Sequence, residues 1–351
     1  MGRSGQITQM MDYFRPIAQY DALRPADALP LAGGWAWFSH AERITRAGSL
    51  GLVALRDIPG DVLDRLTAPR APIAGLTLSA PRLMGILNVT PDSFSDGGQF
   101  FAPEAALQQA QDLVTFGADI LDIGGESTRP GAAEVDRAAE IARTAPIIAA
   151  LRQAGQTLPI SIDTRKADVA AAAVTAGAGI INDVSALGFD PKMADIALQT
   201  GLPLCLMHAQ GTPADMQIAP RYDNVVLDVY DFLAERVAWA QSCGIARDKI
   251  VVDPGIGFGK TVAHNLALLR NLSIFHGLGC PVLLGASRKR FIATLAADGR
   301  DGAGRMPGSV AVALAGVAQG VQIVRVHDVA ETRQSLTLWQ ALTDHNGMGA
   351  E

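Results

Sequence analysis

The sequence predicts an α/β fold, a (β/α)8 TIM barrel with an N-terminal extension over residues 1–80. From residue 82 onward, short aliphatic or β-branched runs alternate with Ala-rich segments of helical spacing, which is the pattern of repeated βαβ units. Eight such strands favour a closed barrel over an open sheet. An open doubly wound sheet would carry a glycine-rich fingerprint in its first turn, whereas this turn reads NVTPDSFSDGG.

The expected strands are short and mostly apolar. They cover residues 82–88, 119–124, 159–163, 179–183, 203–208, 249–253, 281–287 and 321–327. The expected helices cover residues 104–116, 135–154, 166–176, 190–200, 224–243, 263–272, 308–319 and 331–342. Glycines after many of these helices suit C-capping before the next strand.

The first 80 residues lack this rhythm and contain aromatic and Arg-rich pieces. We predict that they form an extension of unknown role, which packs against the outside or bottom of the barrel or makes a dimer contact. Residues 81–345 are predicted to form the barrel domain.

Composition and charge exclude several classes of partner. The net charge of −6 offers no overall positive field to nucleic acid or to an anionic membrane. The three cysteines, Cys205, Cys243 and Cys280, form no C-x-x-C pair, and Cys205 and Cys280 are expected in the core. The N-terminus lacks the apolar core of a secretory signal, and no run approaches about 18 apolar residues, so we expect a cytoplasmic protein.

Polar side chains end nearly every expected strand. These are Asn88, Thr128 and Arg129 in the GGESTR turn, Asp163, Asn182 with Asp183, His208, Asp253, Ser287 through Lys289, and Arg325 with His327. A carboxylate after a strand often only caps the next helix, but capping requires no Arg, Lys or His. Because the carboxyl ends of barrel strands share one mouth, we expect one pocket for a polar heterocycle and an anion.

Two long motifs carry a family resemblance. LMGILNVTPDSFSDGGQF (residues 83–100) and DILDIGGESTRPGA (residues 119–132) are similar to the signatures of dihydropteroate synthases. Further matches are SIDTRK, GIINDVSAL, LMHAQGTP, DPGIGFGK, GASRKRFI and VRVHDVAET, in unbroken order from about residue 81 to residue 342. The resemblance implies that 6-hydroxymethyl-7,8-dihydropterin diphosphate loses pyrophosphate and is captured by 4-aminobenzoate, in a dissociative displacement. It also implies a homodimer.

The resemblance assigns roles to the strand-end residues. Asp163, Asn182, Asp253 and Lys289 have the donors and acceptors that the pterin edge needs, and Met207 matches a position that contacts the pterin ring. The diphosphate is expected at Thr128, Arg325 and His327, and Mg²⁺ at Asn88.

The aminobenzoate site is expected under two loops. The residues implied there are Phe94 and Asp96 in the first loop, Arg129 and Pro130 in the second, Phe258 on the ring, and Ser287 to Arg290 near the carboxylate. Of these, Asp96 and Arg129 are also expected to take part in catalysis together with Lys289, Arg325 and His327.

Other residues receive simpler interpretations. DPGIGFGKT fails as a phosphate-binding P-loop because Pro254 replaces its first glycine, and Lys260 is expected to face solvent. His40, His264, His276 and His345 are expected to be structural or exposed, His208 to contact no substrate, and Asp183 to support the pocket from behind or to be a cap. Glu126 and Asp122 remain open between pocket support and catalysis, and Trp239 is expected in the core.

Two rival functions remain open. A pterin-dependent methyltransferase on the same barrel would share Asp163, Asn182 and Asp253 but would not need Arg325 and His327. A non-catalytic synthase homologue would usually have lost residues of the mouth, and none is missing here.

Overall fold

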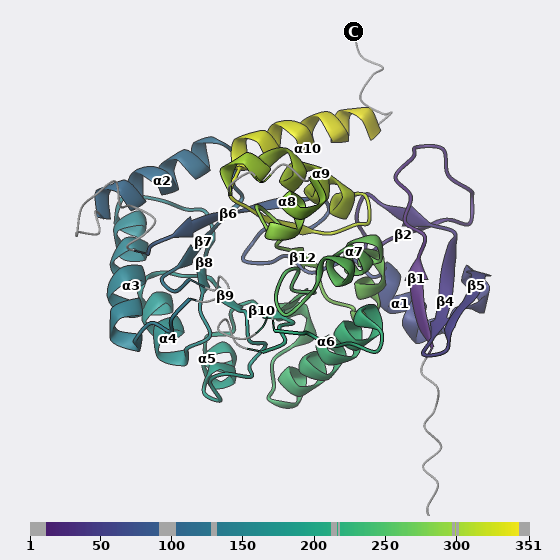
Figure 1. Ribbon diagram of the computed structural model, residues 1–351, viewed down its shortest axis with the longest axis horizontal. Helices are drawn as coiled ribbons and strands as arrows, with labels where there is room; N and C mark the ends of the chain where they lie inside the picture. Colours follow the sequence, from purple (N-terminus) through teal and green to yellow (C-terminus); the bar gives the residue numbers. More distant parts are fainter. Residues whose placement is uncertain are drawn as a thin grey trace, which may run out of the picture.

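A computed structural model describes residues 12–90, 103–127, 132–211, 216, 218–296, 299 and 302–343. Its centre is a sheet of eight parallel strands in the order β11-β10-β9-β8-β7-β6-β13-β12 (Figure 1). A parallel bridge between Val252 and Val282 joins the two ends of this sheet and closes the barrel. The predicted (β/α)8 fold is therefore confirmed.

The barrel strands lie close to their predicted positions. They are β6 (Arg82–Asn88), β7 (Ile120–Gly124), β8 (Ile160–Asp163), β9 (Ile180–Asp183), β10 (Leu204–Met207), β11 (Ile250–Asp253), β12 (Leu283–Leu284) and β13 (Ile323–Val326). Strand β12 is shorter than expected because the chain turns away after Leu284, and Arg288 adopts a φ of 59° in this turn.

The outer helices also follow the prediction, with shifted ends. They are α2 (Pro103–Thr115), α3 (Arg137–Gln153), α4 (Ala167–Ala176), α5 (Met193–Thr200), α6 (Val225–Ser242), α7 (Val262–Arg270), α9 (Met306–Val317) and α10 (Val329–Thr343). The sequence analysis missed α8 (Arg290–Ala296) and the 3-10 helix η4 (Leu272–Leu278). The prediction that Trp239 is a core residue was wrong, because Trp239 is 36% exposed and its ring packs against the Arg236 guanidinium.

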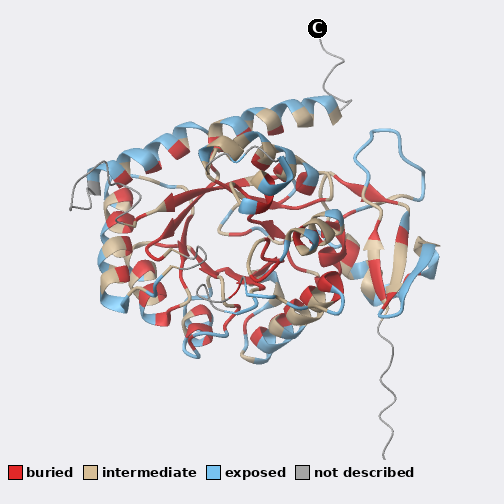
Figure 2. Cartoon of the chain, viewed as in Figure 1, coloured by how far each residue is buried: buried red, intermediate tan, exposed pale blue. Residues whose placement is uncertain are grey.

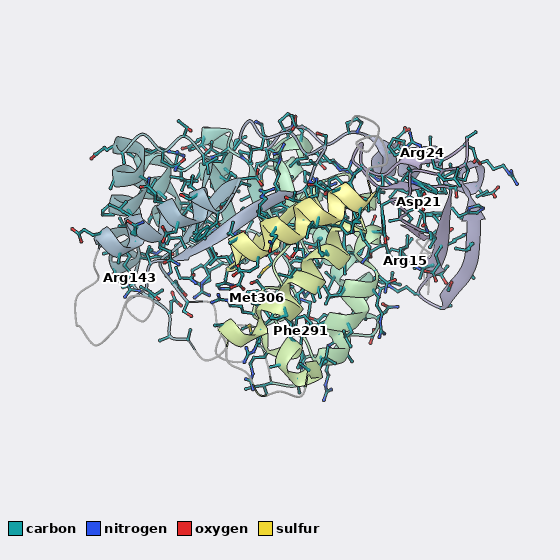
Figure 3. All side chains as sticks on the ribbon, turned by 90° about the horizontal axis from the view of Figure 1, so that it is seen from above. Arg15, Asp21, Arg24, Arg143, Phe291 and Met306 are labelled. Atoms are coloured by element: carbon teal, nitrogen blue, oxygen red, sulfur yellow. The ribbon has the colours of Figure 1, made fainter. Side chains whose placement is uncertain are left out.

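The extension contains its own small sheet. Strands β1 (Tyr13–Pro16), β4 (His40–Thr45) and β5 (Gly48–Ala54) pair in an antiparallel sheet, beside the pair β2 (Leu29–Pro30) and β3 (Trp37–Phe38) and the helix α1 (Gly60–Thr67). From above, Arg15, Asp21 and Arg24 of the extension lie at one end of the molecule, far from Arg143 (Figure 3).

The extension packs on the outside of the barrel and also reaches its bottom. On the outside, the Ser273 hydroxyl donates to the Pro16 carbonyl, and the Trp35 indole N–H donates to the Val317 carbonyl. At the bottom, Ile73 and Leu78 are buried in one cluster with inward-facing residues of the barrel strands. Burying an aliphatic side chain of this size contributes about 1.5–3 kcal/mol, so these two residues help to close the barrel floor.

The barrel interior changes from apolar to polar along its axis. The lower layer is formed by Met84, Ile120, Ile180, Cys205, Val251, Leu283 and Ile323. Side chains two residues further along a strand point to the same side. The next inward layer therefore holds Ile86, Asp122, Asn182, Met207, Asp253, Gly285 and Arg325, and it includes Asp163 of β8, which pairs with Asn182 in register. In Figure 2 the buried strands surround this axis.

Candidate active site

The polar layer is organised around Arg325 of β13. Its Nε donates to Asp122 Oδ2 at 2.6 Å, and its Nη2 donates to Asp163 Oδ2 at 2.7 Å. The Asn182 amide lies 3.4 Å from both oxygens of Asp122. Burial opposes the charge on Arg325, but the two carboxylates raise its pKa above the ordinary range. Asp122 thus supports the pocket by holding Arg325 and Asn182.

Two carboxylates of this layer carry shifted pKa values. Burial raises the pKa of Asp163 and outweighs the opposing effect of Arg325. Burial also raises the pKa of Asp253, while Lys289 opposes the shift. Asp253 Oδ1 accepts a hydrogen bond from the Gly255 amide at 2.7 Å, which fixes the side chain at the end of β11. A neutral heterocycle with N–H donors suits such carboxylates, because it replaces lost water contacts without adding charge.

Glycines leave room in this layer. A side chain at Gly285 would lie 3.6 Å from Asp253 Oδ2 and 3.8 Å from Arg325 Cδ. A side chain at Gly124 would lie 3.6 Å from Asp163 Oδ2 and 3.8 Å from Asn88 Oδ1. Because glycine has no side chain, the space beside Asp253 and Arg325 at Gly285, and beside Asp163 and Asn88 at Gly124, is left unfilled.

Lys289 lies beyond β12 and faces the loop that follows β11. Its Nζ donates to the Ile256 carbonyl and lies 4.3 Å from the centroid of the Phe258 ring. Burial lowers the pKa of Lys289 to about 7, although the nearby Asp253 opposes this shift. The ammonium is therefore held over an aromatic face, close to Asp253, Asp163 and Arg325 of the polar layer.

Ser287 and His327 connect the ends of β12 and β13. The Ser287 hydroxyl lies 3.0 Å from His327 Nδ1 and also accepts from the His327 amide at 3.2 Å. Met207, at the end of β10, is 3% exposed, and Arg290 is exposed at the start of α8. The predicted site residues Phe94, Asp96, Thr128, Arg129 and Pro130 lie outside the described residues.

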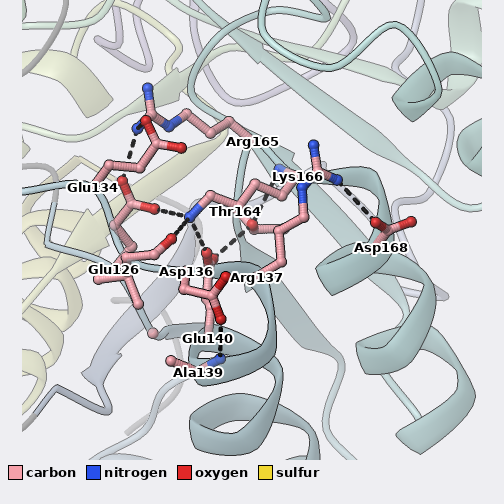
Figure 4. A network of polar contacts seen from close by, with 12 residues as sticks. Glu126, Glu134, Asp136, Arg137, Ala139, Glu140, Thr164, Arg165, Lys166 and Asp168 are labelled. Atoms are coloured by element: carbon pink, nitrogen blue, oxygen red, sulfur yellow. Dashed lines mark hydrogen bonds and ion pairs between the residues drawn. The ribbon is translucent and has the colours of Figure 1, made fainter.

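A buried charge network supports the connection after β7 (Figure 4). Lys166 Nζ contacts Glu126 Oε2 and lies 2.7 Å from Glu140 Oε2, and it also donates to the Val135 carbonyl. Arg165 Nη2 lies 2.9 Å from Glu126 Oε1. Glu126 therefore has a structural role in this network. The motif SIDTRK contributes the two cations that bind Glu126, Arg165 and Lys166. The sequence analysis missed Lys166 because its partners lie 26 to 40 residues away.

Other polar residues support a turn or lie in the core. Asp183 accepts from the amides of Ser185 and Leu187 in the turn after β9, so it supports this turn and caps no helix. His276 is fully buried with Nε2 at 3.0 Å from the Gln319 carbonyl, which confirms its structural role. Lys260 was predicted to face solvent, and this was wrong: it is 3% exposed, and its Nζ is held by backbone carbonyls and His208.

A surface hollow of about 590 Å³ lies outside this set of residues. It is lined by Pro220, Arg221, Tyr222, Asp223, Asp228 and His264, none of which ends a barrel strand. Its lining is open and mixed in charge, so it does not compete with the strand-end layer as the reactive centre.

The fold and this site define an enzyme of the (β/α)8-barrel class with a polar pocket at the carboxyl ends of its strands. Residues 84–327 match the model of the pterin binding enzyme family. The dihydropteroate synthase of Escherichia coli is 46% identical over 266 residues, which cover 76% of this chain and 93% of the relative.

Solved structures agree with this match. The dihydropteroate synthase of Xanthomonas albilineans with 4-aminobenzoic acid is 49% identical, covers 79% of this chain and 98% of its own, and has a TM-score of 0.73. Another structure from the same organism, in complex with 7,8-dihydropteroate, is 46% identical over 78% of this chain and 98% of its own, with a TM-score of 0.70. The chain belongs to the dihydropteroate synthase family of pterin-binding enzymes, and it is a transferase of folate biosynthesis.

The part of the chain that the structure describes contains no helix long and apolar enough to cross a membrane.

Proposed function

We propose that the chain condenses 6-hydroxymethyl-7,8-dihydropterin diphosphate with 4-aminobenzoate and releases pyrophosphate. The observation that carries this proposal is the inward layer of Asp163, Asn182, Asp253 and Arg325 at the strand ends, below Lys289. In the reaction the bond from the exocyclic carbon to the diphosphate oxygen breaks, a carbon–nitrogen bond forms, and the amine loses a proton to solvent.

The pterin is assigned to the carboxylate layer. Asp163 and Asp253 accept from its N–H edge, Asn182 both donates and accepts, and Lys289 donates to its carbonyl oxygen or ring nitrogen. Met207 packs on the ring, and hydrogen bonds to charged groups contribute about 1.5–3 kcal/mol each. The reduced ring can delocalise positive charge, so departure of pyrophosphate can precede attack by the amine without an activated nucleophile.

The diphosphate and the aminobenzoate are assigned to the mouth. Two of the Arg325 N–H groups bind Asp122 and Asp163, which orients its other N–H groups for the diphosphate. His327, which is held by Ser287, and Thr128 are assigned to the same diphosphate. Phe258 and Pro130 would contact the aminobenzoate ring, with Ser287 near its carboxylate. Phe94, Asp96 and Arg129 would exclude water from the cation and hold the leaving group.

The rival functions are separated by product analysis. With both substrates present, we expect pyrophosphate and dihydropteroate in equal amounts, measured by a coupled phosphate assay and by mass spectrometry. A methyltransferase or a non-catalytic homologue would release no pyrophosphate under these conditions. Absence of release from folded protein would refute the proposal.

Mg²⁺ is proposed as the metal, held by Asn88 and otherwise by phosphate oxygens and water, the usual way this ion binds. Among the residues that the structure describes, no group of three His, Cys, Asp or Glu side chains could hold a metal, so a site with one protein oxygen fits the donors present. When bound, the ion neutralises charge on the leaving pyrophosphate.

Metal removal tests this assignment. Excess EDTA is expected to abolish pyrophosphate release, and added Mg²⁺ to restore it. Asn88→Ala should raise the Mg²⁺ concentration needed for half-maximal activity about tenfold, which corresponds to about 1.4 kcal/mol. Unchanged activity in EDTA, or an unchanged Mg²⁺ requirement in the variant, would contradict it.

The site also predicts a pH dependence. Lys289, with a pKa of about 7, loses its charge above neutral pH, so kcat/KM for the pterin diphosphate should fall as the pH rises through about 7. The contribution of Lys289 to the free energy of unfolding should instead rise with pH. In the unfolded protein this lysine keeps its proton up to about pH 10.4, so between pH 7 and about 10.4 the unfolded state binds more protons than the folded state, and stability increases with pH. Kinetics and urea unfolding between pH 6 and 9 measure both trends. A flat alkaline limb would contradict the role of Lys289.

We further propose a cytoplasmic homodimer, on the basis of the family resemblance alone. Light scattering of the purified protein measures its oligomeric state.

A further inference from the structure

The environment of Lys260 is unusual for a lysine. The side chain is buried at the end of the loop that follows β11, and its Nζ has four possible acceptors. They are His208 Nδ1 at 2.8 Å, the Gly255 carbonyl at 2.8 Å, the Phe258 carbonyl at 3.0 Å and the His208 carbonyl at 3.4 Å. An ammonium group has three N–H donors and no acceptor, so His208 Nδ1 must accept one of them, and the carbonyls of Gly255 and Phe258 can accept the other two.

His208 is suited to accept. Burial, followed by the neighbouring Lys260, lowers the pKa of His208 to about 3, so its imidazole is neutral and carries its proton on Nε2. Its ring lies edge-on to Phe232 of the outer helix α6 at 4.8 Å between centroids. Burial and Lys289 lower the pKa of Lys260, but the ring of carbonyl oxygens around its Nζ favours the charged form.

Lys260 joins two strand-end segments that are packed backbone to backbone. Gly255 has a φ of 66°, and a side chain there would lie 1.9 Å from the His208 carbonyl oxygen. Gly259 has a φ of 63°, and a side chain there would lie 2.4 Å from the Gln210 carbonyl oxygen. The loop after β11 therefore lies directly on residues 208–210 after β10, and Lys260 Nζ sits in the seam between them.

This loop carries the groups that set the position of Lys289. Ile256 supplies the carbonyl that accepts from Lys289 Nζ, and Phe258 supplies the ring beneath that ammonium. Gly255 supplies the amide that holds the Asp253 carboxylate. Since Lys260 binds the carbonyls of Gly255 and Phe258, it fixes the loop on both sides of Ile256.

We propose that Lys260, together with neutral His208, is a positioning residue for dihydropteroate synthesis: it shapes the loop after β11 and thereby places Lys289 and Asp253 against the pterin. The N–H groups of Lys260 are used by the protein itself, so it is not a phosphate ligand. This inference rests on the proposed function of the same site.

The test begins with Lys260→Met, which keeps the length of the side chain and removes its donors and charge. Lys192→Met, at an exposed position before α5, is the matched control. For folded Lys260→Met we expect kcat/KM for the pterin diphosphate to fall about 10–100-fold, and the control to match the wild type. The alkaline limb of kcat/KM should also shift, because Lys260 couples electrostatically to Lys289 and fixes the loop whose Ile256 carbonyl accepts from Lys289 Nζ.

A pair of variants at His208 keeps the inference testable if Lys260→Met does not fold. His208→Asn retains an acceptor near the position of Nδ1, whereas His208→Leu removes it with similar bulk. We expect His208→Leu to lose about 3–10-fold more in kcat/KM than His208→Asn, with equal urea midpoints. A role in folding alone would shift the midpoints and leave the pH profile unchanged.

The outcomes separate this inference from the proposed function. Wild-type protein that forms no dihydropteroate would refute the function itself. Active wild type with a folded Lys260→Met variant of unchanged kcat/KM and unchanged alkaline limb would refute only the role of Lys260, as would equal kinetics of the two His208 variants.

Discussion

Replacing Lys289 by alanine is expected to reduce kcat/KM for the pterin diphosphate by about 10²–10³-fold. The lysine lies close to Asp253, and its ammonium is preorganised by the Ile256 carbonyl and the Phe258 ring. Without it, the pterin carbonyl has no charged donor, and Asp253 loses the neighbour that opposes the rise of its pKa. The defect should therefore appear in steady-state kinetics at pH 7 with both substrates.

Stability should not fall with activity in this variant. Burial disfavours the charged form of Lys289, so its removal relieves a cost as well as losing packing. Lys192→Ala, an exposed lysine before α5, is the control for the loss of a lysine elsewhere on the barrel. If Lys289→Ala has near-normal kinetics and the control is also unchanged, the proposal that the pterin binds at Lys289 and Asp253 is contradicted.

The polar layer could be predicted from the sequence because it depends on local pattern. The buried strands β8 and β11 read as short apolar runs, and in both strands the last residue is an aspartate of the polar layer. Asp163 and Asp253 were therefore found without coordinates. Once the barrel closes, strands distant in sequence bring Arg325 to Asp122, 203 residues away.

Residues whose role depends on distant partners could not be predicted. Lys260 looked like a loop residue because the loop sequence does not show that His208 packs against it, 52 positions earlier. Trp239 fits a helical apolar stripe, but the side of α6 that it occupies faces outward, where Arg236 covers it. The extension has no sequence repeat that predicts its small sheet. Packing against the bottom of the barrel was one of the expected roles, but the residues that make this contact, Ile73 and Leu78, are identified only by the structure.

The largest effect on stability is expected for Lys166→Met. Lys166 is 1% exposed and lies between Glu126 and Glu140, and it also binds the Val135 carbonyl (Figure 4). Removing one partner of a buried ion pair typically costs about 3–5 kcal/mol, because the remaining charge has neither water nor a counter-ion. We therefore expect the urea midpoint of Lys166→Met to fall sharply and that of the exposed control Lys192→Met to stay within error.

The pH dependence of this loss identifies its cause. Burial already raises the pKa of Glu140 against the opposing effect of Lys166, so loss of the lysine should raise it further. When a carboxyl group has a higher pKa in the folded than in the unfolded protein, the folded state binds more protons. The free energy of unfolding then increases as the pH falls from the folded pKa to the unfolded pKa, which is about 4.3 for Glu. The difference in free energy of unfolding between Lys166→Met and the wild type should thus become smaller from pH 8 to pH 5. Adding Glu140→Gln to Lys166→Met should make this difference smaller already at pH 8. A gap that stays constant with pH would mean that lost packing, and not an unpaired buried carboxylate, destabilises the variant.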